Sequence, residues 1–139
     1  MRNISIKAVV LGFTVTLLLD ALVGVAVMFL FGRGVFQTAI SEADAIKALA
    51  TISQQTSFLL VSLGLGTLTT VAGGYVCARV AKRLPYMNTA ALGMVGLLFG
   101  FLLADASIPL WFNVLAFVFV MPSSLLGGFF AKRYQPAGA

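Results

Sequence analysis

One acid in this chain lies where an ionised group is costly. The sequence has 139 residues, with only 4 Asp and Glu against 9 Lys and Arg. The stretch "LLLDAL" places Asp20 inside the apolar run 8–31, of which it is the only charged member. A carboxyl group in such a run either binds a proton or a cation, or serves as a polar contact that holds helices together. The sequence leaves both interpretations open.

Asp20 is expected near the middle of a membrane span. It follows Ala8 by twelve residues, which at about 1.5 Å per residue is roughly 18 Å along a helix. An ionised carboxylate at that depth costs about 3 kcal/mol, and every Lys and Arg lies near or beyond the end of an apolar run. Because burial disfavours the charged form, we expect Asp20 to face the bundle interior as a protonated, hydrogen-bonded carboxylic acid.

Several polar side chains in the apolar runs are suitable partners for Asp20. They are Thr16, which precedes it by four residues, the hydroxyls of Thr67, Thr69 and Thr70, and the amide of Asn113. A second acid, Asp105, ends the third apolar run. We interpret Asp105 as an acid at the membrane interface, with a place on an ion pathway as the alternative.

Catalytic chemistry is not indicated by the sequence. The chain has no histidine, so the nucleophile candidates Ser123, Ser124 and Cys77 have no evident activating base. There is no phosphate-binding loop, no pair of closely spaced cysteines and no run of carboxylates with the spacing of metal ligands. We therefore expect no enzyme activity, no metal site and no cofactor.

The elements that must position Asp20 are four apolar runs. Hydrophobic residues make up 60% of the chain and charged residues 9%, with a mean hydropathy of +1.06. The runs cover 8–31, 58–80, 89–106 and 110–130, and about 20 apolar residues suffice to cross a bilayer. The sequence predicts an all-α polytopic membrane protein, a single membrane domain over 1–139 that forms a four-helix bundle. A cleavable signal peptide is the alternative for the first run, although that run is long for one.

The distribution of basic residues predicts the orientation. Most of them fall on one side of a four-span topology, namely Arg2, Lys7, Arg79, Lys82, Arg83, Lys132 and Arg133, whereas Arg33 and Lys47 fall on the other. By the positive-inside rule both termini are cytoplasmic. Because the basic residues flank spans, we expect the lipid bilayer, rather than nucleic acid, to be what they contact.

The loop between the first two runs contains a predicted external helix. In "SEADAIKALATI" Ser41 can cap the helix and Asp44 stands three residues later, as in a capping box. Its expected apolar face consists of Ile46, Leu49 and Ala50. Between the second and third runs, Pro85 predicts a turn.

Small residues and one proline are expected to shape the packing of the spans. Glycines that recur on one helix face allow close approach of helices in lipid, and the candidates are Gly12, Gly24, Gly66, Gly74, Gly96, Gly100 and Gly128. Pro122 lies in the middle of the fourth run, where it removes a backbone hydrogen bond and predicts a kink.

The segment "GGYVCARVAKRLPYMNTAALGMVGLLFG", about a fifth of the chain, resembles a pattern in small, uncharacterised four-helix bacterial membrane proteins. The matching positions are Gly73, Gly74, Tyr75, Ala78, Arg79, Lys82, Gly93, Gly96 and Gly100. The resemblance implies a bacterial inner membrane and no particular activity. Small multidrug resistance transporters are similar in having four short spans and an acid in the first, but their acid is a glutamate, their drug-site aromatic residues are not matched, and their first loop is shorter. That likeness carries only the idea of a proton-coupled acid onto Asp20.

Three functions remain open from the sequence. We expect a non-enzymatic interaction or assembly subunit, with a second copy or another membrane protein as partner and Asp20 as a packing contact. The alternative is a small proton- or cation-coupled transporter or channel that uses Asp20, with Pro122 permitting movement of the fourth span. The third is a pore-forming lysis protein similar to a holin.

Overall fold

The computed structural model describes residues 4–38, 41–81, 84–104 and 106–134. In chain order the helices are α1 (Ile6–Thr38), α2 (Glu42–Ser53), α3 (Thr56–Ala81), α4 (Pro85–Leu102) and α5 (Leu110–Arg133). Within the described ranges there is no β-strand. The prediction of an all-helical chain is confirmed.

Four of the helices are long and apolar enough to cross a membrane. These segments are Ile6–Gly34, Thr56–Ala81, Pro85–Leu102 and Leu110–Arg133. The largest fully buried side chains are polar or small, namely Asn88, Thr89, Cys77, Ser123 and Ser124, whereas large residues such as Leu22, Leu98 and Leu110 face outward. A water-soluble domain has the opposite distribution. This arrangement suits a lipid surrounding, in which helices associate through small and polar residues.

The third span differs from its predicted bounds of 89–106. Helix α4 begins at Pro85, directly after Leu84, whose φ of 52° is left-handed. Proline is favoured at the first position of a helix, because the N–H that it lacks would have no partner there. Pro85 therefore starts the helix rather than forming the turn alone, and the helix ends four residues earlier than predicted. Hydropathy missed the first turn, residues 85–88, because it contains Pro85 and Asn88, and Asn88, although polar, is helical and buried.

The capped helix between the first two spans is present. The Ser41 hydroxyl accepts a hydrogen bond from the Asp44 amide at 3.2 Å, and it donates to the Asp44 carboxylate at 2.6 Å. The predicted apolar face is wrong at two of its three residues, since Ile46 is 60% exposed and Ala50 is exposed as well, whereas Leu49 is partly buried. The buried isoleucine of α2 is Ile52. Which residues of α2 are buried depends on its contacts with the neighbouring helices. The periodicity of its own sequence does not specify those contacts.

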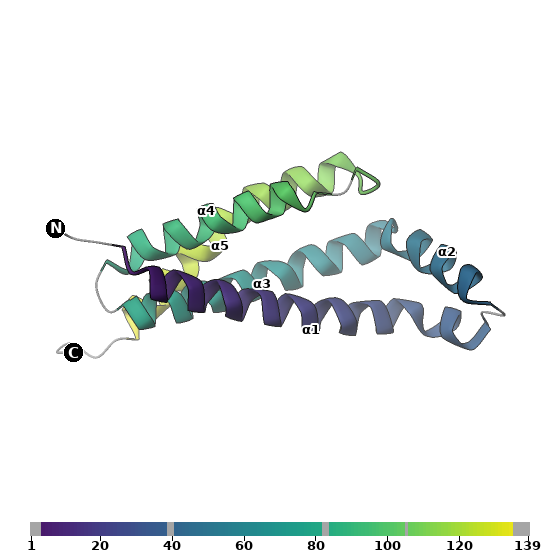
Figure 1. The fold of residues 1–139 in the computed structure, drawn as a ribbon, viewed down its shortest axis with the longest axis horizontal. Helices are drawn as coiled ribbons and strands as arrows, with labels where there is room; N and C mark the ends of the chain where they lie inside the picture. The colour runs from purple at the N-terminus through teal and green to yellow at the C-terminus, as the bar shows by residue number, and fades with distance from the viewer. Residues whose placement is uncertain (1–3, 39–40, 82–83, 105, 135–139) are drawn as a thin grey trace.

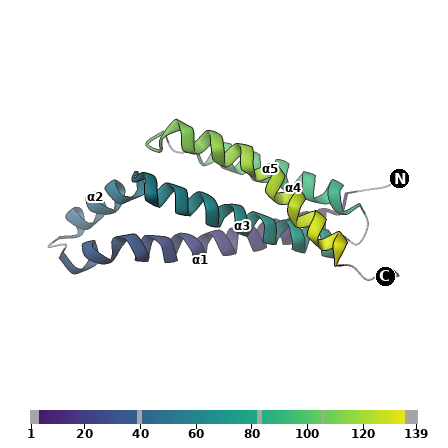
Figure 2. The ribbon, with the colours of Figure 1, turned by 180° about the vertical axis from the view of Figure 1, so that it is seen from behind.

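The four long helices form two pairs, which lie close together at one end of the molecule and apart at the other. Figures 1 and 2 show α1 beside α3 and α4 beside α5. The two pairs converge where α1 begins and α5 ends, and they diverge toward the other end. We refer to the end where the pairs converge as the convergent end and to the opposite one as the open end. At the convergent end, the Ser5 amide donates to the Asn88 side-chain oxygen at 2.7 Å, which links the start of α1 to α4.

Glycines hold the convergent end together. A Cβ added at Gly12 would lie 2.6 Å from the Cys77 Cβ, and one at Gly128 would lie 2.8 Å from the Thr89 hydroxyl. Gly74 contacts the Ser124 backbone in the same way. Because glycine has no side chain, the helices approach one another closely at these three positions. The close pairs are α1 with α3, α3 with α5, and α4 with α5.

The remaining predicted glycines play smaller parts or none in this packing. Cβ atoms at Gly96 and Gly100 would meet single side chains of α5, at 3.3 and 3.2 Å. The packing role predicted for Gly24 and Gly66 is wrong within this chain, because nothing lies within 4 Å of either Cβ position. Gly66 lines the first cavity, between α3 and α5, so no side chain of α5 reaches it. Three further close contacts, at Gly73, Gly93 and Gly127, were not among the predicted packing positions.

Helix α5 bends midway along its length, as Figure 2 shows. Pro122 lies inside this helix and removes the hydrogen bond to the carbonyl four residues earlier. The following hydroxyls bond to other carbonyls, Ser123 to Phe119 O at 2.6 Å and Ser124 to Met121 O at 3.0 Å. The proline and these hydroxyls together account for the bend.

Candidate functional site

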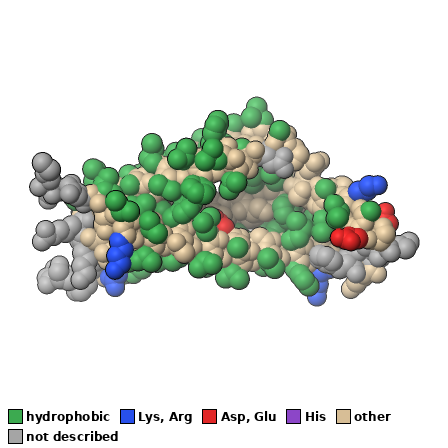
Figure 3. Space-filling view, in the orientation of Figure 1, with side chains coloured by type: hydrophobic (Ala, Val, Ile, Leu, Met, Phe, Trp, Pro, Cys, Tyr) green, Lys and Arg blue, Asp and Glu red, His purple; other side chains and the backbone are tan. Residues whose placement is uncertain are grey.

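Asp20 lies in the space between the two helix pairs. Its side chain is exposed, and it lines two cavities of about 250 Å³ and 200 Å³. The space-filling view shows a hollow between the pairs in which acidic side-chain atoms are visible (Figure 3). The carboxyl group therefore lies in an accessible cleft and is not enclosed between packed helices.

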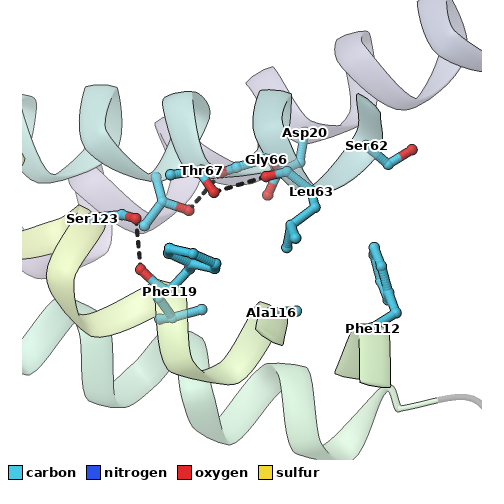
Figure 4. Close-up of a pocket in the computed structure, with 11 residues that line it drawn as sticks. Asp20, Ser62, Leu63, Gly66, Thr67, Phe112, Ala116, Phe119 and Ser123 are labelled. Carbon is cyan, nitrogen blue, oxygen red and sulfur yellow. Dashed lines mark hydrogen bonds between the residues drawn. The ribbon is translucent and has the colours of Figure 1, made fainter. Parts of the chain in front are cut away.

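The first cavity lies between α3 and α5, with Asp20 reaching it from α1 (Figure 4). On the α5 side, Phe112 and Phe119 project toward α3, with Ala116 between them. On the α3 side the lining residues are Ser62, Leu63, Gly66, Thr67 and Thr70. The α5 wall is thus largely apolar apart from Ser123, and the α3 wall carries three hydroxyls.

Asp20 has one side-chain hydrogen-bond partner, the hydroxyl of Thr69, which is itself only 6% exposed. The Thr69 oxygen also lies 2.8 Å from the carbonyl oxygen of Gly66. A hydroxyl has a single proton to donate. Thr69 therefore either donates to an ionised Asp20, or donates to Gly66 and accepts the proton of a neutral Asp20. The contact serves both protonation states of the carboxyl group.

The structure brings together most of the predicted site. Thr70 lines both cavities with Asp20, Thr67 lines the first, and Thr16 lines the second. Asn113 lines neither cavity and is not part of the site, because it lies on another face of α5 from Phe112 and Ala116. Asp105 lies outside the described residues.

Some members of the site were not predicted from the sequence as neighbours of Asp20. Phe112, Phe119, Ser62 and Ser123 complete the first cavity. Ser62 stands four residues before Gly66 and eight before Thr70, so the helical repeat was an available signal for it. No comparable signal identifies the two phenylalanines, because α5 carries aromatic residues on several faces.

Asp20 is the sole ionisable side chain among the residues that line the two cavities. In the described part of the chain, no three His, Cys, Asp or Glu residues gather as metal ligands. No Lys or Arg lines either cavity. The site therefore consists of one carboxyl group in cavities that several hydroxyls line, with no positive side chain among the lining residues.

A separate basic and aromatic cluster lies at the convergent end. Tyr86, Phe129, Lys132 and Arg133 line a shallow cavity of about 350 Å³. The Lys132 Nζ atom lies 5.4 Å from the centre of the Tyr86 ring, within the range of a cation–π interaction. Aromatic and basic side chains together are typical of a membrane interface.

No protein family, characterised protein or solved structure matches this chain significantly. Function must therefore be inferred from the residues and geometry of the cleft.

Proposed function

We propose that this chain is a small transporter or channel in which Asp20 binds and releases a proton or a small cation. The observation that supports this is the setting of Asp20, which is exposed in a cleft whose lining includes several hydroxyls. A carboxyl group that served only as a contact between helices of one chain would be enclosed by them. A group that loads and unloads an ion must be reachable, as this one is.

The shape of the molecule supports directional access to Asp20. Gly12, Gly74 and Gly128 close the convergent end, while the two pairs diverge at the other (Figure 1). In a transporter that works by alternating access, the closed end must open while the open end closes. Pro122 lies in the middle of α5, where a missing backbone hydrogen bond lets the helix change its bend.

The orientation that we propose has both termini in the cytoplasm of a bacterial inner membrane. The described basic residues at the convergent end are Lys7, Arg79, Lys132 and Arg133, whereas Arg33 and Lys47 belong to the open end together with Glu42 and Asp44. This asymmetry agrees with the positive-inside rule. The cleft and α2 would then face the outside.

The test is ion flux in proteoliposomes, measured for the wild-type chain, Asp20→Asn and the control Glu42→Gln. Asparagine keeps hydrogen bonding but cannot ionise, so we expect flux of protons or monovalent cations to fall by at least about tenfold, equivalent to about 1.4 kcal/mol. Glu42→Gln removes a carboxylate from exposed α2 and should leave flux unchanged. Equal flux from wild type and Asp20→Asn, both folded, would rule out this function.

A second candidate is an interaction or assembly subunit in which a helix of another protein, or of a second copy, occupies the cleft. It is favoured by the free space at Gly66, where nothing lies within 4 Å of a Cβ, since small residues at open faces permit close helix approach. This function predicts no flux from the wild type and a stable complex that includes the chain. It also predicts that Asp20→Asn keeps the fold and the activity of that complex.

A further inference from the structure

The cavities beside Asp20 present oxygen atoms that accept hydrogen bonds. Thr70 donates its hydroxyl proton to the Gly66 carbonyl at 2.8 Å, and Thr67 donates to the Leu63 carbonyl at 2.7 Å. A hydroxyl has one proton and two lone pairs. Each of these threonines uses its proton within α3 and keeps its remaining lone pairs for the cavity.

Two of the other helices that line the cavities, α5 and α1, follow the same pattern. Ser123 donates to the Phe119 carbonyl of α5 at 2.6 Å, and Thr16 donates to the Gly12 carbonyl of α1 at 3.0 Å. No side chain that lines either cavity contains an N–H group. Hydroxyl oxygens of these four residues, from three helices, thus line the cavities that Asp20 lines, with their protons directed back into their own helices.

A group of oxygen acceptors around a single carboxylate is suited to a cation of single charge. Carboxylate, carbonyl and hydroxyl oxygens are hard ligands that bind hard metal ions. One carboxylate neutralises one positive charge, whereas a divalent ion would leave a net charge inside the membrane, where it is costly. Two cavities meet at Asp20 and Thr70, which line both.

We propose that Asp20 and Thr70 form the centre of a binding site for a monovalent metal cation, with Thr67 and Ser123 as further oxygen ligands. The proposal rests on the function proposed above, because Asp20 is the same group, and it identifies the class of ion. A proton and the metal ion compete for one carboxyl group, and no other ionisable side chain faces these cavities. Metal binding therefore weakens as the pH falls.

The experiment is equilibrium binding of radioactive Na⁺ to the purified full-length chain in detergent, with choline chloride keeping the ionic strength constant. Asp20→Asn should lose saturable binding. Thr70→Val should weaken binding by about tenfold or more, and Thr70→Ser, which restores the hydroxyl, should remain close to the wild type. The matched control is Thr14→Val, because Thr14 is exposed on α1 and lines neither cavity.

Circular dichroism on every variant establishes that the helices are intact. If Asp20→Asn does not fold, the comparison of Thr70→Val with Thr70→Ser still tests the site. Absence of saturable Na⁺ binding by the wild type, or equal binding by Thr70→Val and Thr14→Val, overturns the proposal.

The outcome also separates this proposal from the function on which it rests. Proton flux that depends on Asp20, without any Na⁺ binding, would leave the proposed transport intact and overturn the metal site. Saturable Na⁺ binding that depends on Asp20 and Thr70, without flux, would support the site and contradict transport.

Discussion

At the scale of single residues, the same amino acid has opposite consequences at two positions of α1. Gly12 lies against Cys77 and the backbone of Gly73, whereas no atom lies within 4 Å of a Cβ at Gly24. Both glycines were predicted from the sequence to be packing positions. Only the neighbour across the interface distinguishes a required glycine from a dispensable one.

This difference predicts the effect of adding one methyl group. Gly12→Ala would place a Cβ 2.6 Å from that of Cys77, and overpacking of this kind costs about 1–3 kcal/mol. Gly24→Ala meets open space and should be neutral or stabilising by up to about 1 kcal/mol, because alanine is the better helix former. Unfolding in mixed micelles with increasing SDS measures both. Equal stability of the two variants would mean that the α1–α3 contact is not as close as described.

At the scale of elements, α5 combines close glycine contacts with an internal proline. Its C-terminal part packs against α3 and α4 through Gly127 and Gly128, and its N-terminal part carries the aromatic wall of the first cavity. Pro122 separates these two parts. A change in the bend would move the wall while the glycine contacts stay in place.

Pro122→Ala tests that role. Alanine restores the backbone N–H and favours a straighter, stiffer helix, so we expect slower ion flux with unchanged or higher stability. Leu126→Ala, which changes an exposed residue of the same helix, is the control and should leave flux unchanged. Flux from Pro122→Ala equal to that of the wild type would show that the bend is structural only.

At the scale of the whole molecule, the divergence of the two helix pairs and the distribution of charged residues distinguish the same two ends. The first and last helices begin and end at the convergent end (Figure 1), as an even number of spans requires. The acids Glu42 and Asp44 lie at the open end, on α2. The proposed orientation therefore puts the closed end toward the cytoplasm.

Reporter fusions check this orientation. Green fluorescent protein fused after Ala139 should fluoresce, and alkaline phosphatase at the same position should be inactive, because the proposed C-terminus is cytoplasmic. Alkaline phosphatase fused after Gln55, which follows α2, should be active. The reverse pattern would invert the topology and place the cleft on the cytoplasmic side.

The sequence by itself determined the apolar helices and the position of Asp20 midway along the first of them, whereas the tertiary structure decided what lies near that residue. Hydropathy, length and capping are local properties, so they predicted four apolar helices and the Ser41 cap. They misplaced the start of α4 because Pro85 and the buried polar residue Asn88 belong to its first turn. The contact of Asp20 with Thr69, rather than with Thr67 or Asn113, depends on how each helix is rotated about its own axis. In lipid, that rotation is set by the close glycine contacts between helices, which exist only once the chain has folded.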